Sequence, residues 1–207
     1  GAKHSLANAM MAVVNPGDEV IVPAPYWVSY VEQVKLAEGK SVIVPTTLDN
    51  HFKLQPEQLK QAITPKTKAI ILCSPSNPTG SIYTHQELKA LADVIGQSNQ
   101  EIYIISDEIY EYINFEGKHE SIAQFEEVKD QVIIVNGVSK GFAMTGWRIG
   151  YIAAPLDIAK ACSKRQGQVT SGACAMAQPA SLTARTGAKR FTQEMKETNK
   201  RRRNLEM

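Results

Sequence analysis

The sequence predicts an α/β fold with three layers, in which a mainly parallel sheet has helices on both faces. Two observations support this prediction. Short apolar runs typical of buried strands alternate with longer segments whose apolar residues recur at helical spacing. Several of the apolar runs also end abruptly in turn residues or charged residues, and open α/β sheets bind their ligands beyond such strand ends.

The expected elements follow one another in a regular order along the chain. We expect strands at residues 19–23, 41–45, 68–73, 101–106, 132–136 and 149–154. We expect helices at about 3–14, 27–38, 55–63, 84–97, 155–166 and 188–206. The run Asn15-Pro16-Gly17-Asp18 ends the first helix, and Thr84 with Glu87 forms a capping box for the fourth.

The composition fits a single domain without a charge bias. The 207 residues are 43% hydrophobic and carry a formal net charge of +2, so neither nucleic acid nor a membrane is expected as a partner. The basic run Lys200-Arg201-Arg202-Arg203 is interpreted as the solvated face of a terminal helix, because no aromatic residues are interleaved with it. No apolar run has the length of a membrane span.

Neither the cysteines nor the histidines show the spacing of a metal site, so no metal is expected. The odd number of cysteines and the lack of a CxxC pair indicate a reducing compartment, and we expect a cytoplasmic protein. The cysteines are Cys73, Cys162 and Cys174, and the histidines are His4, His51, His85 and His119.

Three predicted strands end in chemically useful groups. Asn77 follows residues 68–73, Asp107 and Tyr110 follow residues 101–106, and Lys140 follows residues 132–136. If these strands are parallel neighbours, the four side chains converge on one rim of the sheet. A lysine there can form a Schiff base with a carbonyl cofactor. Arg148, after a glycine-containing turn, can bind an anion.

Each of these residues has an ordinary alternative. Lys140 and Arg148 could be solvated loop charges, and Asp107 could cap a helix. The turn that contains Asn77 is an ordinary turn sequence, and Trp27 alone is more often a core or interface tryptophan. One bound cofactor accounts for all of them together.

In this order, four motifs resemble the fold type I, pyridoxal-phosphate-dependent aminotransferases, most closely the bacterial aspartate aminotransferases. They are Pro25-Tyr26-Trp27, Ser76-Asn77-Pro78-Thr79-Gly80, Ser106-Asp107-Glu108-Ile109-Tyr110-Glu111, and Ser139-Lys140 with Arg148 eight residues later. The resemblance covers essentially the whole chain. It implies the large, cofactor-binding domain of that fold, with the strand at 149–154 antiparallel to the others.

The resemblance implies that pyridoxal 5'-phosphate is the cofactor and gives each residue a role. Lys140 would hold the cofactor covalently and then move the substrate's α-proton. Asp107 would pair with the ring nitrogen and keep its positive charge. Asn77 and Tyr110 would bond the ring's phenolic oxygen, and Trp27 would offer a flat face to the ring.

The resemblance also implies a site for the cofactor's phosphate. Arg148 would bind it bidentately, and Gly1-Ala2-Lys3, at the start of the first helix, would present backbone N–H groups to it. Gly137 stands where many relatives carry a phosphate-binding hydroxyl. That contact would be missing, or would come from the backbone or from Ser139.

The substrates implied are an amino acid and a 2-oxo acid, most closely aspartate with 2-oxoglutarate as the acceptor. Lys3 matches a lysine that reaches the distal carboxylate in the aspartate-using subgroup, and Trp27 and Asn77 complete the expected substrate-binding set. Other activities stay open, namely aromatic or alanine transamination and carbon–sulfur lysis. A non-catalytic, cofactor-sensing domain of a transcription regulator is a further alternative.

Compared with this family, the chain begins at the phosphate loop and ends within or just after a helix. We therefore expect residues 1–207 to be the large domain of a longer, homodimeric enzyme, truncated at both ends. The N-terminal arm and the small C-terminal domain would be absent, and the fragment alone would be poorly active.

Overall fold

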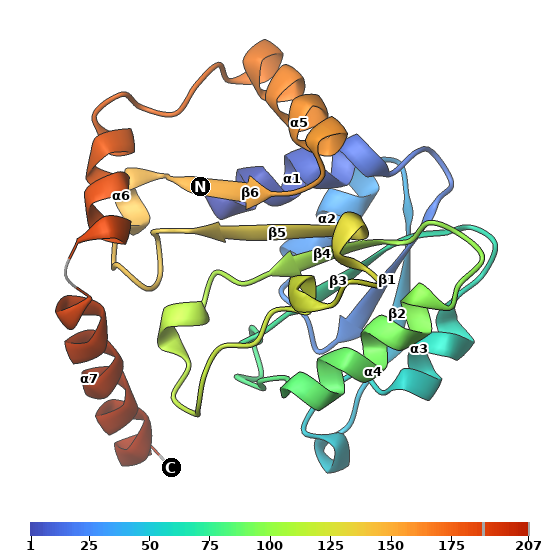
Figure 1. Ribbon diagram of the computed structural model, residues 1–207, viewed down its shortest axis with the longest axis horizontal. Helices are drawn as coiled ribbons and strands as arrows, with labels where there is room; N and C mark the ends of the chain where they lie inside the picture. The colour runs from blue at the N-terminus through green and yellow to red at the C-terminus, as the bar shows by residue number, and fades with distance from the viewer. Residues whose placement is uncertain (188, 207) are drawn as a thin grey trace.

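The centre of the computed structural model, which describes residues 1–187 and 189–206, is a six-stranded sheet in the order β2-β1-β3-β4-β5-β6 (Figure 1). The strands are β1 (Glu19–Ala24), β2 (Lys40–Pro45), β3 (Thr67–Cys73), β4 (Tyr103–Asp107), β5 (Val132–Gly137) and β6 (Gly150–Ala153). Strands β1 to β5 pair in parallel, and β6 runs antiparallel to β5. The expected mixed, mainly parallel sheet is therefore confirmed.

Helices cover both faces of this sheet and form the two outer layers (Figure 1). Helices α1 (Ala2–Val13), α2 (Ser29–Leu36) and α5 (Leu156–Val169) pack with one face, and α3 (Pro56–Ala62) and α4 (His85–Gly96) pack with the other. The capping box that begins α4 is present, since the Thr84 and Glu87 side chains each accept a hydrogen bond from the other's backbone N–H.

Each central strand sends alternate side chains into two separate cores. In β4, Tyr103 and Ile105 pack with α1 and α2, whereas Ile104 packs with α4. This follows from the period of two in a strand, and it explains why the strands are nearly continuous apolar runs. The same alternation continues past Ile105 at the end of β4. Position 107 therefore faces α1 and α2, as the other odd positions do, and position 108 faces the side of α4.

The C-terminal part differs most from the prediction. The structure contains a helix α6 (Ala177–Thr186) that the sequence pattern did not predict, and α7 (Arg190–Glu206) in the expected terminal position. The start of the predicted helix, residue 188, lies outside the described residues. Pro179 obscured α6, although proline is tolerated in the first turn of a helix. Five short 3-10 turns within the described residues were also not expected.

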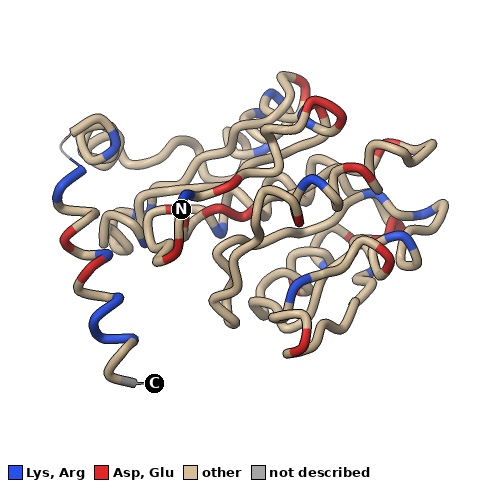
Figure 2. Tube along the Cα trace, turned by 60° about the horizontal axis from the view of Figure 1, so that its bottom comes forward, with Lys and Arg blue, Asp and Glu red and all other residues tan. Residues whose placement is uncertain are grey.

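Helix α7 lies at one end of the molecule and carries much of the basic charge near the C-terminus (Figures 1 and 2). Lys200, Arg201 and Arg202 are exposed, whereas the Arg203 guanidinium lies 5.2 Å from the ring centroid of Phe115. The basic run is thus mainly a solvated face. Among the described helices, none has both the length and the apolar character that a membrane crossing requires.

Candidate active site

The carboxyl ends of β3, β4 and β5 lie side by side and open into one cavity of about 350 Å³. Cys73 pairs with Asp107, so β3 and β4 end level, whereas Asp107 pairs with Val135 and β5 continues to Gly137. The predicted site residues among the cavity's lining are Ala2, Lys3, Trp27, Asn77, Asp107, Tyr110, Ser139, Lys140 and Arg148. Segments from the start, the middle and the later part of the chain therefore meet at this rim.

Asp107 is the buried charge of the cavity. Its side chain points toward α1 and α2, as its odd position in β4 requires, and the residue is 4% exposed. Oδ2 accepts a hydrogen bond from the Tyr30 hydroxyl at 2.8 Å, and Oδ1 accepts one from the Ile109 N–H at 3.2 Å. Burial raises the pKa of the Asp107 carboxyl to about 6, against the effect of these two hydrogen bonds, and the charge of Glu108 adds to the rise.

A buried carboxylate of this kind is suited to a positively charged partner. Among the described residues, no lysine, arginine or histidine forms an ion pair with Asp107. Each carboxylate oxygen has a second lone pair that can accept another donor. A protonated ring nitrogen would supply both the charge and the donor, so the residues fit the cofactor that the sequence implies.

Lys140 lies three residues beyond β5 with a free amino group. Within the described part of the chain its side chain forms no hydrogen bond or ion pair, and Nζ lies 5.7 Å from the ring centroid of Tyr110. Burial, together with the neighbouring Cys73 and Asp107, raises the pKa of the Tyr110 phenol, and a hydrogen bond with Asn77 opposes this rise. The two residues expected to bond a phenolic oxygen therefore lie in contact.

The opposite end of the site brings the first turn of α1 against the loop before β6. The Gly1 nitrogen donates to the Arg148 carbonyl oxygen at 2.8 Å, and Arg148 Nη1 donates to the Thr145 carbonyl oxygen at 2.7 Å. Arg148 has φ of 55°, which turns the chain sharply before β6. Helix N–H groups and a guanidinium thus lie together, as an anion site requires.

Two glycines permit this close approach. A Cβ on Gly150 would lie 2.2 Å from the backbone nitrogen of Ala2, so only glycine lets α1 begin against β6. A Cβ on Gly137 would lie 2.7 Å from the Ile149 carbonyl oxygen. The close pairing of β5 with β6 therefore explains why no hydroxyl-bearing side chain stands at position 137. Ser139 is buried beside the cavity.

Trp27 and Lys3 form the remaining wall. The Lys3 ammonium lies 4.8 Å from the centroid of the Trp27 ring, and the Trp27 ring meets the Tyr30 ring edge to face at 5.4 Å. Lys3 is exposed and Trp27 is half-buried, so the cation stands at the entrance while the indole forms part of the wall.

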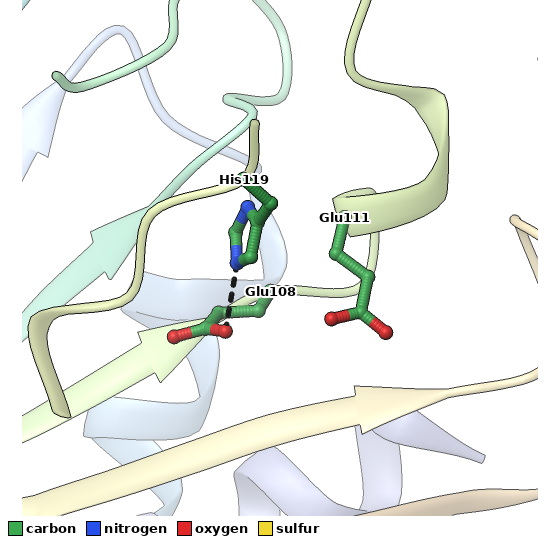
Figure 3. A group of neighbouring side chains, drawn as sticks. All are labelled: Glu108, Glu111 and His119. Atoms are coloured by element: carbon green, nitrogen blue, oxygen red, sulfur yellow. Dashed lines mark hydrogen bonds and ion pairs between the residues drawn. The ribbon is translucent and has the colours of Figure 1, made fainter. Parts of the chain in front are cut away.

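Glu108, next to Asp107, points away from the cavity into a polar cluster. Its Oε1 accepts from Ser106 Oγ at 3.0 Å and Ser121 Oγ at 2.6 Å, and its Oε2 lies 2.8 Å from His119 Nε2 (Figure 3). Glu111 lies beside this pair, and the ligand-type atoms of Glu108, Glu111 and His119 lie within 4.8 Å of one another. The sequence spacing of the histidines did not indicate this cluster. Because the Glu108 carboxylate already accepts hydrogen bonds from protein donors, we assign this cluster as an anchor for the loop after Tyr110, which folds back and carries His119 and Ser121.

We predict that the His119 anchor makes folding stability depend on pH. Burial alone would lower the pKa of His119, but the hydrogen bond and charge of Glu108, with the charges of Glu111 and Glu120, together raise it. Because this pKa is higher in the folded than in the unfolded state, protonated His119 stabilises the fold. The stabilisation is complete below the unfolded pKa of about 6.5 and is lost as the pH rises through the folded pKa. His119→Gln should therefore lower the free energy of unfolding by about 1.5–3 kcal/mol at pH 6 and by less at pH 8.5.

Denaturant unfolding of both proteins between pH 5.5 and 8.5 measures this difference. His85→Gln is the control, because His85 pairs with Glu120 at 3.4 Å in an exposed position. A His119→Gln effect that is the same at both pH values would contradict the assignment.

Two groups at this rim were not found from the sequence. Tyr30 was not identified, although the predicted helix at 27–38 would place it on one face with Trp27, three residues earlier. Glu108 has no predicted role of its own within the motif Ser106–Glu111, although the period of two places it on the face opposite Asp107. These periodicities were the available signals, but neither identifies the partner residue.

Comparison with known proteins shows that this chain is similar to aminotransferases. The family model described as "Aminotransferase class I and II" matches residues 1–206. The chain is 51% identical over 207 residues to the aspartate aminotransferase of Geobacillus stearothermophilus, covering 99% of this chain and 52% of that protein. It is 48% identical over 208 residues to a probable aspartate/prephenate aminotransferase of Rhizobium leguminosarum bv. phaseoli, with the same coverage.

The solved structures agree with the sequence relatives. The aspartate aminotransferase from Rhizobium meliloti superposes with a TM-score of 0.96 at 42% identity, over 99% of this chain and 52% of that one. The chain therefore spans about half the length of the relatives it matches.

Proposed function

The chain belongs to the class I and II aminotransferase family, and from that premise we propose that the whole protein transfers the amino group of aspartate to 2-oxoglutarate with pyridoxal 5'-phosphate. The observation that carries the proposal is the single cavity in which a free lysine, a buried carboxylate and an anion site meet. When bound, the cofactor supplies a carbonyl group for the amine and an electron-withdrawing ring. The remaining tasks fall to residues of this chain.

Lys140 is proposed to hold the cofactor through Nζ and to move the proton at the substrate's α-carbon. A single amine can do both, because it is a nucleophile when it is neutral and an acid when it is protonated. Asp107 holds a proton on the ring nitrogen, since its desolvated carboxylate gains most from a cationic partner. Asn77 and Tyr110 fix the ring's oxygen, and Trp27 borders the ring.

Arg148 and the first turn of α1 are proposed to hold the phosphate. Gly1 and Ala2 contribute the positive end of a helix, and Ser139 contributes a buried hydroxyl. The close contact of Ala2 with Gly150 keeps this end rigid. Phosphate binding then orients the reacting end of the cofactor toward Lys140.

Lys3 is proposed to select dicarboxylic substrates. It is an exposed cation at the entrance, held against Trp27. The relatives named above are all aminotransferases, which favours this activity over carbon–sulfur lysis or cofactor sensing. One of them is named for prephenate as well as aspartate, so prephenate belongs among the acceptors tested.

We also propose that the whole protein is a cytoplasmic homodimer. All three cysteines are free, with Cys162 buried and Cys174 exposed, which fits a reducing compartment. Light scattering of the purified protein measures the oligomeric state.

We predict that the whole protein converts aspartate and 2-oxoglutarate to oxaloacetate and glutamate. The kcat/KM for aspartate should exceed that for alanine by at least about tenfold, because a hydrogen bond to a charged group contributes about 1.5–3 kcal/mol. Lys3→Met should remove most of this preference, whereas Lys35→Met, on the exposed side of α2, should not. The measurement is oxaloacetate formation with each donor, and with prephenate as an alternative acceptor.

Two results would count against the proposal in different ways. Equal use of alanine and aspartate would contradict the role of Lys3. Absence of amino transfer with every donor and acceptor would contradict the function itself.

A further inference from the structure

Tyr30 makes the only side-chain hydrogen bond to Asp107 among the residues that the structure describes. It lies in the first turn of α2 and is 2% exposed, and its hydroxyl donates to Asp107 Oδ2 at 2.8 Å in a buried contact. The two residues are 77 positions apart in the sequence. The contact therefore joins a helix to the end of the central strand.

The Tyr30 ring is fixed by its surroundings. It belongs to the core formed with α1, where Leu6 and Met10 are also buried, and it meets the Trp27 ring edge to face at 5.4 Å. Burial, and then the charge of Asp107, raise the pKa of the Tyr30 phenol well above its ordinary value. The hydroxyl therefore stays protonated and donates throughout the working pH range.

This bond leaves Asp107 free to serve a second partner. Oδ1 is held by the Ile109 N–H and Oδ2 by Tyr30, so the carboxylate cannot rotate, while each oxygen keeps a lone pair for another donor. A donor on Oδ2 also stabilises the ionised form of a group that burial drives toward protonation. Without the Tyr30 hydrogen bond, the Asp107 carboxyl binds a proton more tightly and would take a larger share of any proton that lies between it and a neighbouring base.

We propose that Tyr30 is a positioning residue that keeps Asp107 ionised and oriented, and thereby keeps the proton on the ring nitrogen of the bound cofactor. The first half of the inference, the ionisation and orientation of Asp107, concerns only the chain itself. The second half, the proton on the ring nitrogen, rests on the proposed function. The two halves can therefore be measured separately.

The first measurement uses the protein without cofactor. With ¹³C-labelled aspartate, NMR follows the titration of the Asp107 carboxyl in the parent protein and in Tyr30→Phe. The midpoint should rise in Tyr30→Phe by about one to two pH units, which corresponds to the loss of a hydrogen bond to a charged group. Cys73, Glu108 and Tyr110 are the titratable groups nearest Asp107, and the charged residues Lys3, Lys140 and Arg148 line the same cavity; all of them are unchanged in this variant.

Tyr83→Phe is the matched control. Tyr83 is also a buried tyrosine, and its hydroxyl accepts a hydrogen bond from the Leu54 N–H at 2.8 Å. This variant loses a buried phenol hydroxyl without touching Asp107, so it should leave the Asp107 midpoint unchanged. If Tyr30→Phe does not fold, 3-fluorotyrosine at position 30 keeps the shape and strengthens the donor, and should lower the midpoint.

The second measurement uses cofactor labelled with ¹⁵N in the ring. In Tyr30→Phe the ring nitrogen signal should move toward its unprotonated position, while Tyr83→Phe should match the parent protein. An unchanged Asp107 midpoint in both Tyr30 variants would overturn the inference. A shifted midpoint with an unchanged ring signal would overturn its second half. Failure of the parent protein to bind pyridoxal phosphate would contradict the proposed function, and the second half would fall with it.

Discussion

Replacing Lys140 with alanine is expected to abolish covalent capture of pyridoxal phosphate. It should also lower kcat by about 10²–10⁴-fold, which is the usual contribution of a positioned acid–base group. Lys140 is the one lysine in the cavity that lies directly beyond a central strand, and its Nζ has no competing partner among the described residues. The loss should be large because one residue is assigned both the attachment and the proton transfer. Borohydride reduction of the loaded protein, followed by peptide mass mapping, should place the label on Lys140.

Lys160→Ala is the control for this experiment, since Lys160 is an exposed lysine of α5. It should leave the label and the turnover unchanged. A label found mainly on Lys3, or a Lys140→Ala protein with normal turnover, would show that the assignment is wrong.

Replacing Asp107 with alanine is expected to lower kcat by about 10²–10³-fold, the usual effect of removing one preorganised electrostatic partner. The cofactor should still bind at high concentration, because we assign its covalent and phosphate contacts to Lys140 and Arg148. The effect should therefore appear in kcat more than in cofactor affinity. Steady-state kinetics and a cofactor titration by absorbance measure the two quantities.

Asp157→Ala, at the exposed start of α5, is the matched control. Because Asp107→Ala also leaves the Tyr30 hydroxyl without its acceptor, unfolding curves should accompany the kinetics. Near-normal kcat in a folded Asp107→Ala protein would mean that another group keeps the ring nitrogen charged.

The centre of the sheet could be predicted from the sequence because its central strands are buried on both faces. Residues 68–73 and 132–136 read as continuous apolar runs, and each coincides with an observed strand to within a residue. Asp107 was expected just beyond its strand and is instead the last residue of β4. That difference does not change the predicted site, because Asp107 still lies at the carboxyl end of β4, where the cavity opens.

Contacts between distant segments could not be predicted in the same way. The bond from Tyr30 to Asp107 depends on where α2 lies over the sheet, and no local pattern encodes that placement. The same holds for His119, which reaches Glu108 only because the loop after Tyr110 folds back. Helix α6 was missed for a different reason, since a proline in its first turn resembles a helix breaker.

The contact between Ala2 and Gly150 has a consequence for the order of events during protein synthesis. Ribosomes add about 5–20 residues per second, so Gly150 is made on the order of ten seconds after Ala2. Until then, the first turn of α1 has nothing to close against, and Arg148 has not yet been made. The phosphate end of the site is thus among the last parts to assemble, after the parallel strands are already available to pair. A nascent chain that ends after Lys140 but before Arg148 would contain Asp107 and Lys140 and still lack Gly150 and the residue that we propose binds the cofactor's phosphate.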